Sequence, residues 1–457
     1  MTTTQKIPHK TMLAAWTIML AAIAPMLDST MVNIAVKELT HDFATTLGVI
    51  QWGITGYVLA LAVAVPVSGW LMNRFDGKKV LMAATLAFGL TSVLAGFSWT
   101  IETFIAFRLL QGFSAGIITP LMSTLLVKTA GPENIGKIIS IVTTPMIFGP
   151  IFGPVLGGFI VEFASWRWIF YINVAVVVIS LVMMRKNLPD FPAFDKTSRL
   201  DIPGISLLSL MSVALIFGVS KAADQASFAN ANTLIWLLLG LIFAGAYVIY
   251  DKKNHGRSIL PLALFRHRTF KATSIGLFLA NIAIMGPMLI LPLFFQNVLH
   301  LTTIGAALAL IPQGLGMLVT RPYIGKMIDR IGAKQVVLVS LVVCLIGSVP
   351  LIFITAHTSL IWLSIVLFIR GASFGGVNIP LSSDAYTGLD DKELPQAGVG
   401  VNIIENLGAS FGTALLATIV AATTIGKGMI AGFHAGFLAS AIVLALIFLP
   451  AVFLTKK

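Results

Sequence analysis

Long apolar stretches recur along almost the whole 457-residue chain, and they constrain its fold more than any other feature. A helix needs about 20 apolar residues to cross the hydrocarbon core of a bilayer, and we count roughly fourteen stretches that meet this standard. Hydrophobic residues make up 57% of the chain and charged residues 11%, whereas a soluble domain carries about 25% charge. We therefore predict an all-α polytopic membrane protein with about 14 transmembrane helices.

Lysine and arginine are concentrated in alternate loops between these stretches, which is the pattern that marks the cytoplasmic side of a membrane protein. The basic loops include Arg74, Lys78 and Lys79, then Arg185, Lys186, Lys196 and Arg199, then Lys252, Lys253, Arg266, Arg268 and Lys271, and then Lys326, Arg330 and Lys334. The opposite loops hold Lys37, Arg167, Lys221 and Lys427. Both termini are thus expected to be cytoplasmic. The net charge of +12 reflects orientation rather than nucleic-acid binding, and the single cysteine, Cys344, excludes an intrachain disulfide.

Matching residues at a nearly constant offset indicate an internal repeat. The pairs are Gly69 and Gly325, Arg74 and Arg330, Gly116 and Gly376, Pro120 and Pro380, Gly149 and Gly408, and Gly153 and Gly412. We predict an N-terminal six-helix half over residues 1–200, two inserted transmembrane helices with a basic linker over 201–268, and a C-terminal six-helix half over 269–457. Secondary transporters are built from such repeats, with the substrate site between them at the middle of the bilayer.

Asp28 lies within the first apolar stretch, where a charged side chain costs about 2.5–3.5 kcal/mol to insert. Counted from the outer ends of their spans at about 1.5 Å per residue, Asp28 is ~12 Å deep and Arg108 in the fourth stretch is ~9 Å deep. Arginine stays charged and holds a nearby carboxylate ionised, so the two form a candidate proton-coupling pair. The alternatives are a static ion pair, two residues that never meet, or an aspartate that only holds helices together.

Six sequence motifs resemble those of the major facilitator superfamily, and specifically its fourteen-span drug:proton antiporter branch. They are LDSTMVNIAV at 27–36, QWGITGYVLALAVAVPVSGWL at 51–71, GWLMNRFDGKK at 69–79, RLLQGFSAG at 108–116, GPIFGPVLGG at 149–158 and GKMIDRIGAK at 325–334. The resemblance implies the major facilitator fold, with a twelve-helix core and two extra helices. It also implies export driven by the proton gradient.

Two of these motifs suggest moving contacts. The fifth-stretch motif provides closely spaced glycines with prolines, which favour tight and bent helix packing, and we interpret it as a gate, with ordinary small-residue packing as the alternative. Its residues are Gly149, Pro150, Gly153, Pro154, Gly157 and Gly158. The loop motif, which combines acidic and basic residues at helix ends, is interpreted as an inner gate, with orientation charge as the alternative. Its two copies are Gly69, Asn73, Arg74 and Asp76, and Gly325, Asp329 and Arg330; Asn73 replaces the usual aspartate of the motif.

Glu405 is a second acid inside an apolar stretch, and it shares a helix face with Asn402. We interpret it as a second proton-coupling site or an anchor for a cationic drug; the alternative is a neutral, hydrogen-bonded glutamate at a helix contact. Arg370 is a candidate partner or a structural counter-charge. Candidate cavity residues, chosen by helix and depth, are Trp52, Tyr57, Phe148, Asn281, Gln313, Asn402 and Phe411.

The favoured function is a proton-coupled antiporter that exports lipophilic, often cationic drugs across the plasma membrane by alternating access. An exporter of a dedicated metabolite, lipid or siderophore is the alternative on the same fold, and a receptor or channel is a third. The sequence contains no GxxxxGK[ST] motif and no hydrolase triad, so neither ATP-driven transport nor an enzyme is expected. We expect no metal and no cofactor other than the coupled proton, a monomer in the lipid bilayer, and small-molecule drugs as partners.

Overall fold

The computed structural model describes residues 8–455 apart from 33, 46, 132–137, 140–147, 198 and 255–257, and this part of the chain contains helices and no strand. Twelve of its helices are long and apolar enough to cross a bilayer. This confirms the predicted all-α polytopic membrane fold. The contacts divide the chain into two compact units, Met1–Leu200 with Asp390–Val399, and Asp201–Leu389 with Gly400–Lys457.

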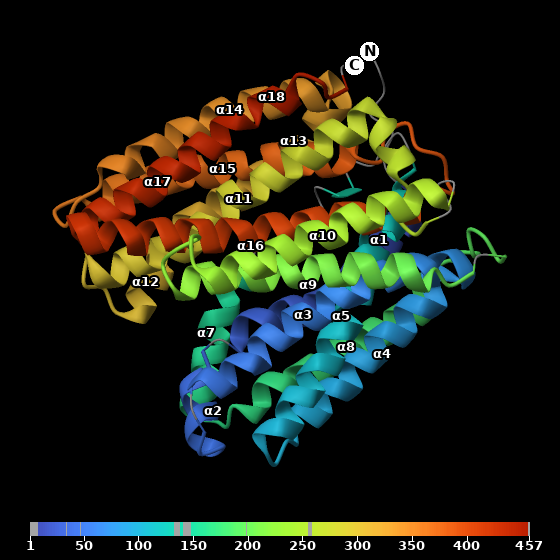
Figure 1. Ribbon diagram of the computed structural model, residues 1–457, viewed down its shortest axis with the longest axis horizontal. Coiled ribbons are helices and arrows are strands. Elements are labelled where there is room, and N and C mark those ends of the chain that lie inside the picture. The colour runs from blue at the N-terminus through green and yellow to red at the C-terminus, as the bar shows by residue number, and fades with distance from the viewer. Residues whose placement is uncertain are drawn as a thin grey trace. The chain divides into compact units, whose positions relative to one another are not determined.

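The first unit is a bundle in which α5 is central, since it packs against α1, α3 and α4, while α8 packs against α1 and α4 (Figure 1). Aliphatic and aromatic side chains of α1, α4, α5 and α8 form its core. Its helices are α1 (His9–Met31), α2 (Val36–Asp42), α3 (Leu47–Arg74), α4 (Gly77–Gly96), α5 (Ile101–Ala130), α7 (Phe148–Phe163) and α8 (Arg167–Asn187).

Local sequence sets the boundaries of the helices that carry the charged residues. Asp76 begins α4 by accepting a hydrogen bond from the Lys79 N–H at 3.0 Å. Thr100 begins α5 through a reciprocal pair of bonds with Thr103, a capping box that satisfies two otherwise unpaired donors. Gly131 ends α5 with φ of 69°, a left-handed conformation that favours glycine.

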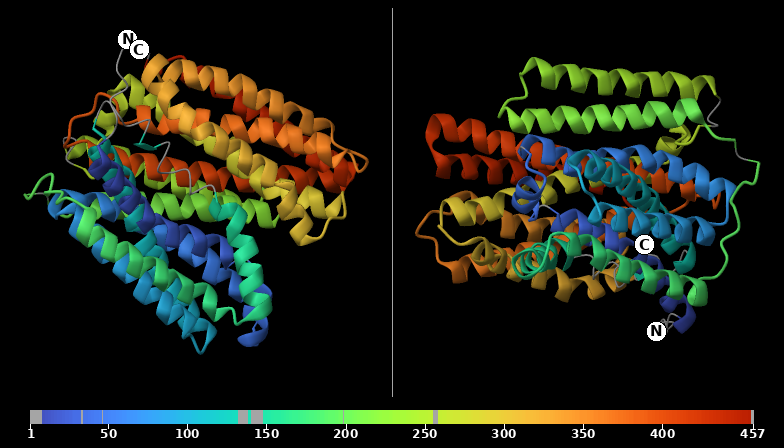
Figure 2. Two further views of the ribbon diagram at one scale, coloured as in Figure 1. Left: turned by 180° about the vertical axis from the view of Figure 1, so that it is seen from behind. Right: turned by 90° about the horizontal axis from the view of Figure 1, so that it is seen from below.

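The second unit repeats the arrangement, since α15 packs against α11, α13 and α14, and α17 packs against α11 and α14 (Figure 2). Its helices are α9 (Ile202–Asp224), α10 (Ala231–Lys253), η2 (Leu262–Arg266), α11 (Arg268–Asn297), α12 (Thr303–Ala309), α13 (Ile311–Ile331), α14 (Ala333–Ser348), η3 (Val349–Phe353), α15 (Leu360–Asp384), α16 (Leu394–Lys427), α17 (Met429–Leu446) and α18 (Phe448–Ala451).

The inserted helices α9 and α10 pack against each other and are tied to the linker that follows them. Asp251 on α10 is buried and accepts hydrogen bonds from the Ser258 hydroxyl and from the Leu262 N–H. Asp201, before α9, accepts bonds from the Tyr250 hydroxyl and from the Ile259 N–H. Both carboxylates therefore have structural partners. Whether residues 201–268 form a domain of their own remains a prediction.

Two of the predicted spans depart from simple membrane helices. The fifth corresponds to α7, of which 16 residues are described. The tenth is divided into α12 and α13, and the second part carries Arg321, Lys326 and Asp329. With Arg330 this helix of 21 residues carries four charges, which lower its hydropathy and make the tenth stretch a weaker membrane segment than its neighbours.

Candidate functional site

Asp28 on α1 and Arg108 on α5 form an ion pair inside the first unit. The Arg108 guanidinium donates to Asp28 Oδ2, and the two side chains are 1% and 0% exposed respectively. The structure therefore brings together the two charges whose depths match in the sequence. Removing one partner of such a buried pair is strongly destabilising, by about 3–5 kcal/mol, because the other charge is left uncompensated.

Two amides complete the coordination of Asp28. Its Oδ1 accepts from Gln111 Nε2 at 3.0 Å and from Asn173 Nδ2 on α8 at 2.9 Å. Gln111 Oε1 accepts from Arg108 at 2.6 Å, and its Nε2 also donates to Ser92 Oγ at 2.7 Å. The amide of Gln111 can face only one way, since its oxygen must meet the cation and its nitrogen the carboxylate. Both carboxylate oxygens of Asp28 thus accept hydrogen bonds.

Arg108 is held on its other sides by the backbone and by an aromatic ring. Its Nε donates to the Gly53 carbonyl at 3.1 Å, and its Cζ lies 4.2 Å from the centre of the Tyr57 ring. A cation over an aromatic face gains about 0.5–2 kcal/mol, more when desolvated. Tyr57, a predicted cavity residue, therefore belongs to the wall of the ion-pair centre.

The glycines of the fifth-span motif bring α7 against α1 within one turn of Asp28. A Cβ atom on Gly153 would lie 2.0 Å from Thr30 Oγ1, and one on Gly157 would lie 3.2 Å from the Met31 Cα. A Cβ atom on Gly158 would make only an ordinary contact, since the nearest atom, Ile34 Cγ2, is 4.0 Å away. The side-chain positions of Phe148, Gly149, Pro150 and Pro154 lie outside the described residues.

The second unit contains a related centre around Arg370, which is 1% exposed. Its nitrogens donate to Ser348 Oγ at 3.1 Å, Gln313 Oε1 at 3.0 Å and the Ala283 carbonyl at 3.3 Å. By the offset that pairs Gly69 with Gly325, Gln313 corresponds to Tyr57 of the first unit, and by the offset that pairs Gly116 with Gly376, Arg370 corresponds to Leu110. Among the described residues, Arg370 forms no ion pair with a carboxylate.

Glu405 on α16 does not pair with Arg370. Its Oε1 accepts a hydrogen bond from Ser382 Oγ at 2.9 Å, and its side chain is half-buried. The buried Tyr386 hydroxyl, which interacts electrostatically with Glu405, has no hydrogen-bond partner in the described part of the chain. Glu405 therefore stands beside an unsatisfied polar group, separate from the arginine.

The remaining cavity candidates fall into different environments. Trp52 is 48% exposed, Asn402 is buried, and the Asn281 amide donates to the Leu277 carbonyl at 2.9 Å. Phe411 packs against Phe278, with ring centres 5.8 Å apart. Among the residues that the structure describes, no contact gathers these side chains around a common cavity within either unit, and their role in substrate binding stays a prediction.

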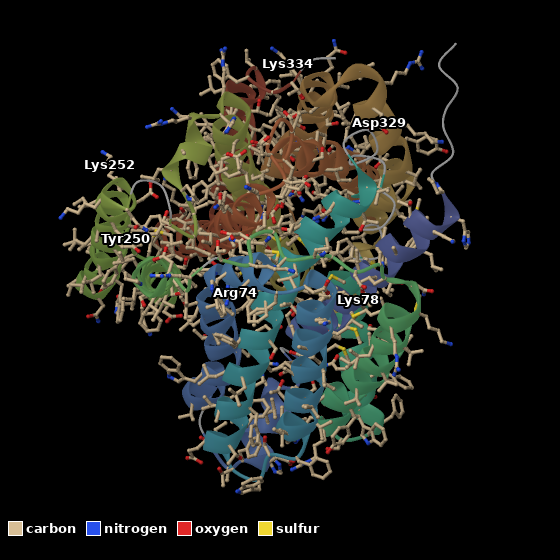
Figure 3. The ribbon with its side chains drawn as sticks, turned by 90° about the vertical axis from the view of Figure 1, so that its right-hand side faces the viewer. Arg74, Lys78, Tyr250, Lys252, Asp329 and Lys334 are labelled. Carbon is tan, nitrogen blue, oxygen red and sulfur yellow. The ribbon has the colours of Figure 1, made fainter. Side chains whose placement is uncertain are left out.

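The two loop motifs lie at helix ends, as their sequence pattern indicates. In the first copy Gly69 is buried, Arg74 is exposed, Asp76 caps α4, and the Asn73 carbonyl accepts from the Asp195 N–H at 2.9 Å. In the second copy Gly325 is buried, Asp329 is half-buried and Arg330 is exposed at the end of α13. Figure 3 shows Arg74 at an end of the first unit's helices. The gate role of both copies remains a prediction.

Gln111, Asn173 and Ser92 were not predicted as site residues. Each is a polar side chain in an otherwise apolar stretch, and Gln111 follows Arg108 by three residues on the same helix face. This spacing is the sequence feature from which Gln111 could have been predicted as a partner of Arg108. In the described residues, no cluster of His, Cys, Asp or Glu could hold a metal ion.

A membrane-embedded bundle built from two similar units, with a buried ion pair between its helices, defines a polytopic transporter. The chain belongs to the Major Facilitator Superfamily, whose sequence profile matches residues 18–413. The predicted membership is thereby confirmed.

Several relatives are named as drug exporters. The multidrug resistance protein B homolog of Mycobacterium tuberculosis is 32% identical over 404 residues, covering 88% of this chain and 74% of the relative. The multidrug export protein EmrB of Haemophilus influenzae is 28% identical, with 87% of this chain and 78% of the relative covered. These matches place the chain among relatives from the drug:proton antiporter branch.

Solved structures share the fold at low sequence identity. The human organic anion transporter MFSD10 has a TM-score of 0.66 at 14% identity, with 97% of this chain and 100% of that chain covered. The proton:xylose symporter XylE has a TM-score of 0.66 at 16% identity, with 97% and 94% covered. The predicted major facilitator fold is confirmed by this likeness.

Proposed function

We propose that this protein exports lipophilic, often cationic drugs across the plasma membrane in exchange for protons. The observation that carries the proposal is the fully buried ion pair of Asp28 and Arg108 in the membrane-spanning part of the first unit. Export of drugs is supported by the printed names of its relatives in Mycobacterium tuberculosis and Haemophilus influenzae. Both termini are proposed to be cytoplasmic, in keeping with the loop charges.

The ionised centre defines one conformation of the first unit. Asp28 then accepts from Arg108, Gln111 and Asn173, so both carboxylate oxygens are satisfied. Charge-assisted hydrogen bonds are roughly twice as strong as neutral ones, which makes this arrangement rigid. While the carboxylate keeps its charge, a substrate that displaced these groups would lose the free energy of their hydrogen bonds to Asp28.

Protonation of Asp28 changes this balance. The neutral carboxyl no longer compensates Arg108, whose remaining partners are the Gln111 oxygen, the Gly53 carbonyl and the Tyr57 ring. An uncompensated buried guanidinium costs several kcal/mol, so a conformation that gives Arg108 water or another partner becomes favoured. A proton on Asp28 therefore selects between two conformations, which is the requirement for coupling.

The contact between α7 and α1 would link protonation of Asp28 to the proposed gate. Thr30 and Met31, which touch Gly153 and Gly157, follow Asp28 on the same helix. A small rotation or shift of α1 on protonation must therefore disturb the tight glycine contact. We propose that this contact opens and closes during alternating access.

Glu405 is proposed to act in the second unit as a further proton site or as the anchor of a cationic substrate. Its carboxylate has one oxygen bonded to Ser382 and lies near the unsatisfied Tyr386 hydroxyl. A substrate ammonium could therefore be held by the carboxylate and the hydroxyl together, at a site that is only partly desolvated.

The proposal is tested with purified protein in liposomes that contain a pH-sensitive dye. Ethidium, tetraphenylphosphonium and several neutral lipophilic drugs are added in turn, and the internal pH is followed. Proton movement with many unrelated compounds is expected, since a lipophilic site discriminates weakly. A response to a single metabolite, lipid or siderophore would favour the dedicated exporter. Proton movement with no tested compound would contradict proton-coupled drug export.

A further inference from the structure

A cavity of about 820 Å³ lies at the turn between α3 and α4, away from the ion-pair centre. Arg74, Lys79 and Lys196 supply three cations to its lining, and Phe75 and Val80 supply apolar surface. Figure 3 shows Arg74 and Lys78 at the same end of the first unit's helices.

The walls of the cavity are fixed by hydrogen bonds from the segment that follows α8. The Gly77 N–H donates to the Phe191 carbonyl at 2.8 Å, and the Asp195 N–H donates to the Asn73 carbonyl at 2.9 Å. Lys78 Nζ donates to the Leu188 carbonyl at 2.7 Å. The segment is therefore held against the α3–α4 turn, and the cavity is formed before any ligand arrives.

The charge of the lining is predominantly positive. Among the described residues, Arg74, Lys79 and Lys196 form no ion pair with a carboxylate. Asp76 is the acid of the lining, and its Oδ1 accepts from the Lys79 N–H at 3.0 Å. Asp195 interacts electrostatically with Arg74 but accepts its hydrogen bonds from Thr197. Three cations facing one engaged acid favour an anionic ligand.

The cavity lies where two candidate membrane spans meet. The membrane span Trp52–Arg74 ends at it, and the span Gly77–Gly96 begins at it. Phe75 is 46% exposed and packs edge-on against Trp70, with ring centres 5.6 Å apart. Aromatic rings and basic side chains gather where lipid headgroups lie.

An exposed apolar stripe leads away from the cavity along α4. Ala83, Leu86, Leu90 and Leu94 are exposed at spacings of three and four residues, so they share the face that begins at Lys79. An acyl chain requires such a track, whereas a soluble phosphate compound does not. This continuity distinguishes a lipid from a free anion.

We propose that this cavity binds the phosphate of an anionic phospholipid, with Arg74, Lys79 and Lys196 around the headgroup and the acyl chains along α4. Each interfacial cation strengthens binding to an anionic lipid roughly fivefold. The site requires only that the chain spans a membrane, so it stands whether or not the protein exports drugs.

The test is the binding of phosphatidylglycerol to the whole protein, measured by native mass spectrometry after titration into mixed micelles of detergent and phosphatidylcholine. The variant Lys79→Gln/Lys196→Gln should bind about 25-fold more weakly, because two of three cations are lost. Lys79→Arg/Lys196→Arg should bind like the wild type. The matched control, Arg185→Gln/Lys186→Gln, removes two exposed charges at the end of α8 that do not line the cavity.

Equal weakening in the control and cavity variants would overturn the proposal, since general surface charge would then suffice. Unchanged affinity in the cavity variant would also overturn it. Adding millimolar inorganic phosphate distinguishes a site for a lipid headgroup from a site for free phosphate. Retained lipid supports a lipid site, whereas complete displacement of the lipid would show a site for soluble phosphate and contradict the acyl-chain track. Circular dichroism of each variant establishes that it is folded. The variant Lys79→Arg/Lys196→Arg changes the same two positions but keeps their charge, so it separates loss of charge from any other effect of substitution.

Discussion

Gly153 on α7 is packed so tightly against α1 that the structure leaves no room for a side chain. A Cβ atom there would lie 2.0 Å from Thr30 Oγ1 and 2.8 Å from Thr30 Cβ, whereas ordinary contact begins at 3.4 Å. Thr30 Oγ1 donates to the Leu27 carbonyl at 2.9 Å, which resists a rotation that would clear the space. The two helices would have to separate, and the contact nearest to Asp28 would be lost.

The expected cost can be worked out from this overlap. Overpacking by a methyl group costs about 1–3 kcal/mol, so Gly153→Ala should destabilise the protein by that amount. Gly158→Ala is the matched control, because its Cβ would meet its nearest atom at 4.0 Å. Alanine is favoured over glycine in a helix by ~1 kcal/mol, so this variant should be neutral or slightly stabilised. Gly153→Leu should abolish transport while the protein remains in the membrane.

The assay combines thermal unfolding in detergent with efflux of a fluorescent drug from cells, at matched amounts of membrane protein. A second change, Thr30→Gly, removes the obstructing atoms and should restore part of the efflux lost in Gly153→Ala. Wild-type efflux from Gly153→Leu would refute the interpretation of this contact as a gate. Equal effects of Gly153→Ala and Gly158→Ala would refute the steric reasoning itself.

Three further predictions follow from other regions of the chain. In a Cys344→Ala background, Met327→Cys should react with a membrane-impermeant maleimide only after cells are opened; labelling of intact cells would contradict the proposed topology. Gln111→Leu should lower the free energy of unfolding by about 1–3 kcal/mol, because Asp28 and Arg108 each lose a buried partner; unchanged thermal stability would count against the network. The Trp166 indole and Arg167 lower the pKa of Asp42. The contact of Asp42 with Trp166 should therefore persist from neutral pH to about 4 and weaken only as pH falls further, which Trp166 fluorescence would report; loss of the contact near pH 6 would contradict this.

Depth along the spans could be predicted from the sequence because a helix rises by a constant amount per residue. Asp28 and Arg108 lie at similar depths by this count, and the structure joins them. The internal repeat could also be predicted from the sequence, since residues at a constant offset take equivalent positions in the two units. Gly153 packs on α1 as Gly412 packs on α11.

The partners of buried polar groups could not be predicted, because they depend on which helices are neighbours and how each is rotated. Asn173 reaches Asp28 only because α8 packs against α1. Arg370 and Glu405 show the same limit. Ser382, which holds Glu405, follows Arg370 by twelve residues on α15, or about 18 Å along the helix, so the acid and the base lie at different depths.

Asp28 as the carrier of the coupled proton is tested most directly by drug-dependent proton movement in liposomes containing Asp28→Asn, with drug binding measured on the same preparation. Asparagine keeps the size and much of the hydrogen bonding of the side chain but cannot titrate, so binding should survive and pH-driven uphill transport should vanish. The matched control is Asp251→Asn, which replaces a buried aspartate whose partners lie in the linker after α10. This control should retain coupling. Full coupling in Asp28→Asn would contradict the assignment and leave Glu405 as the proton carrier.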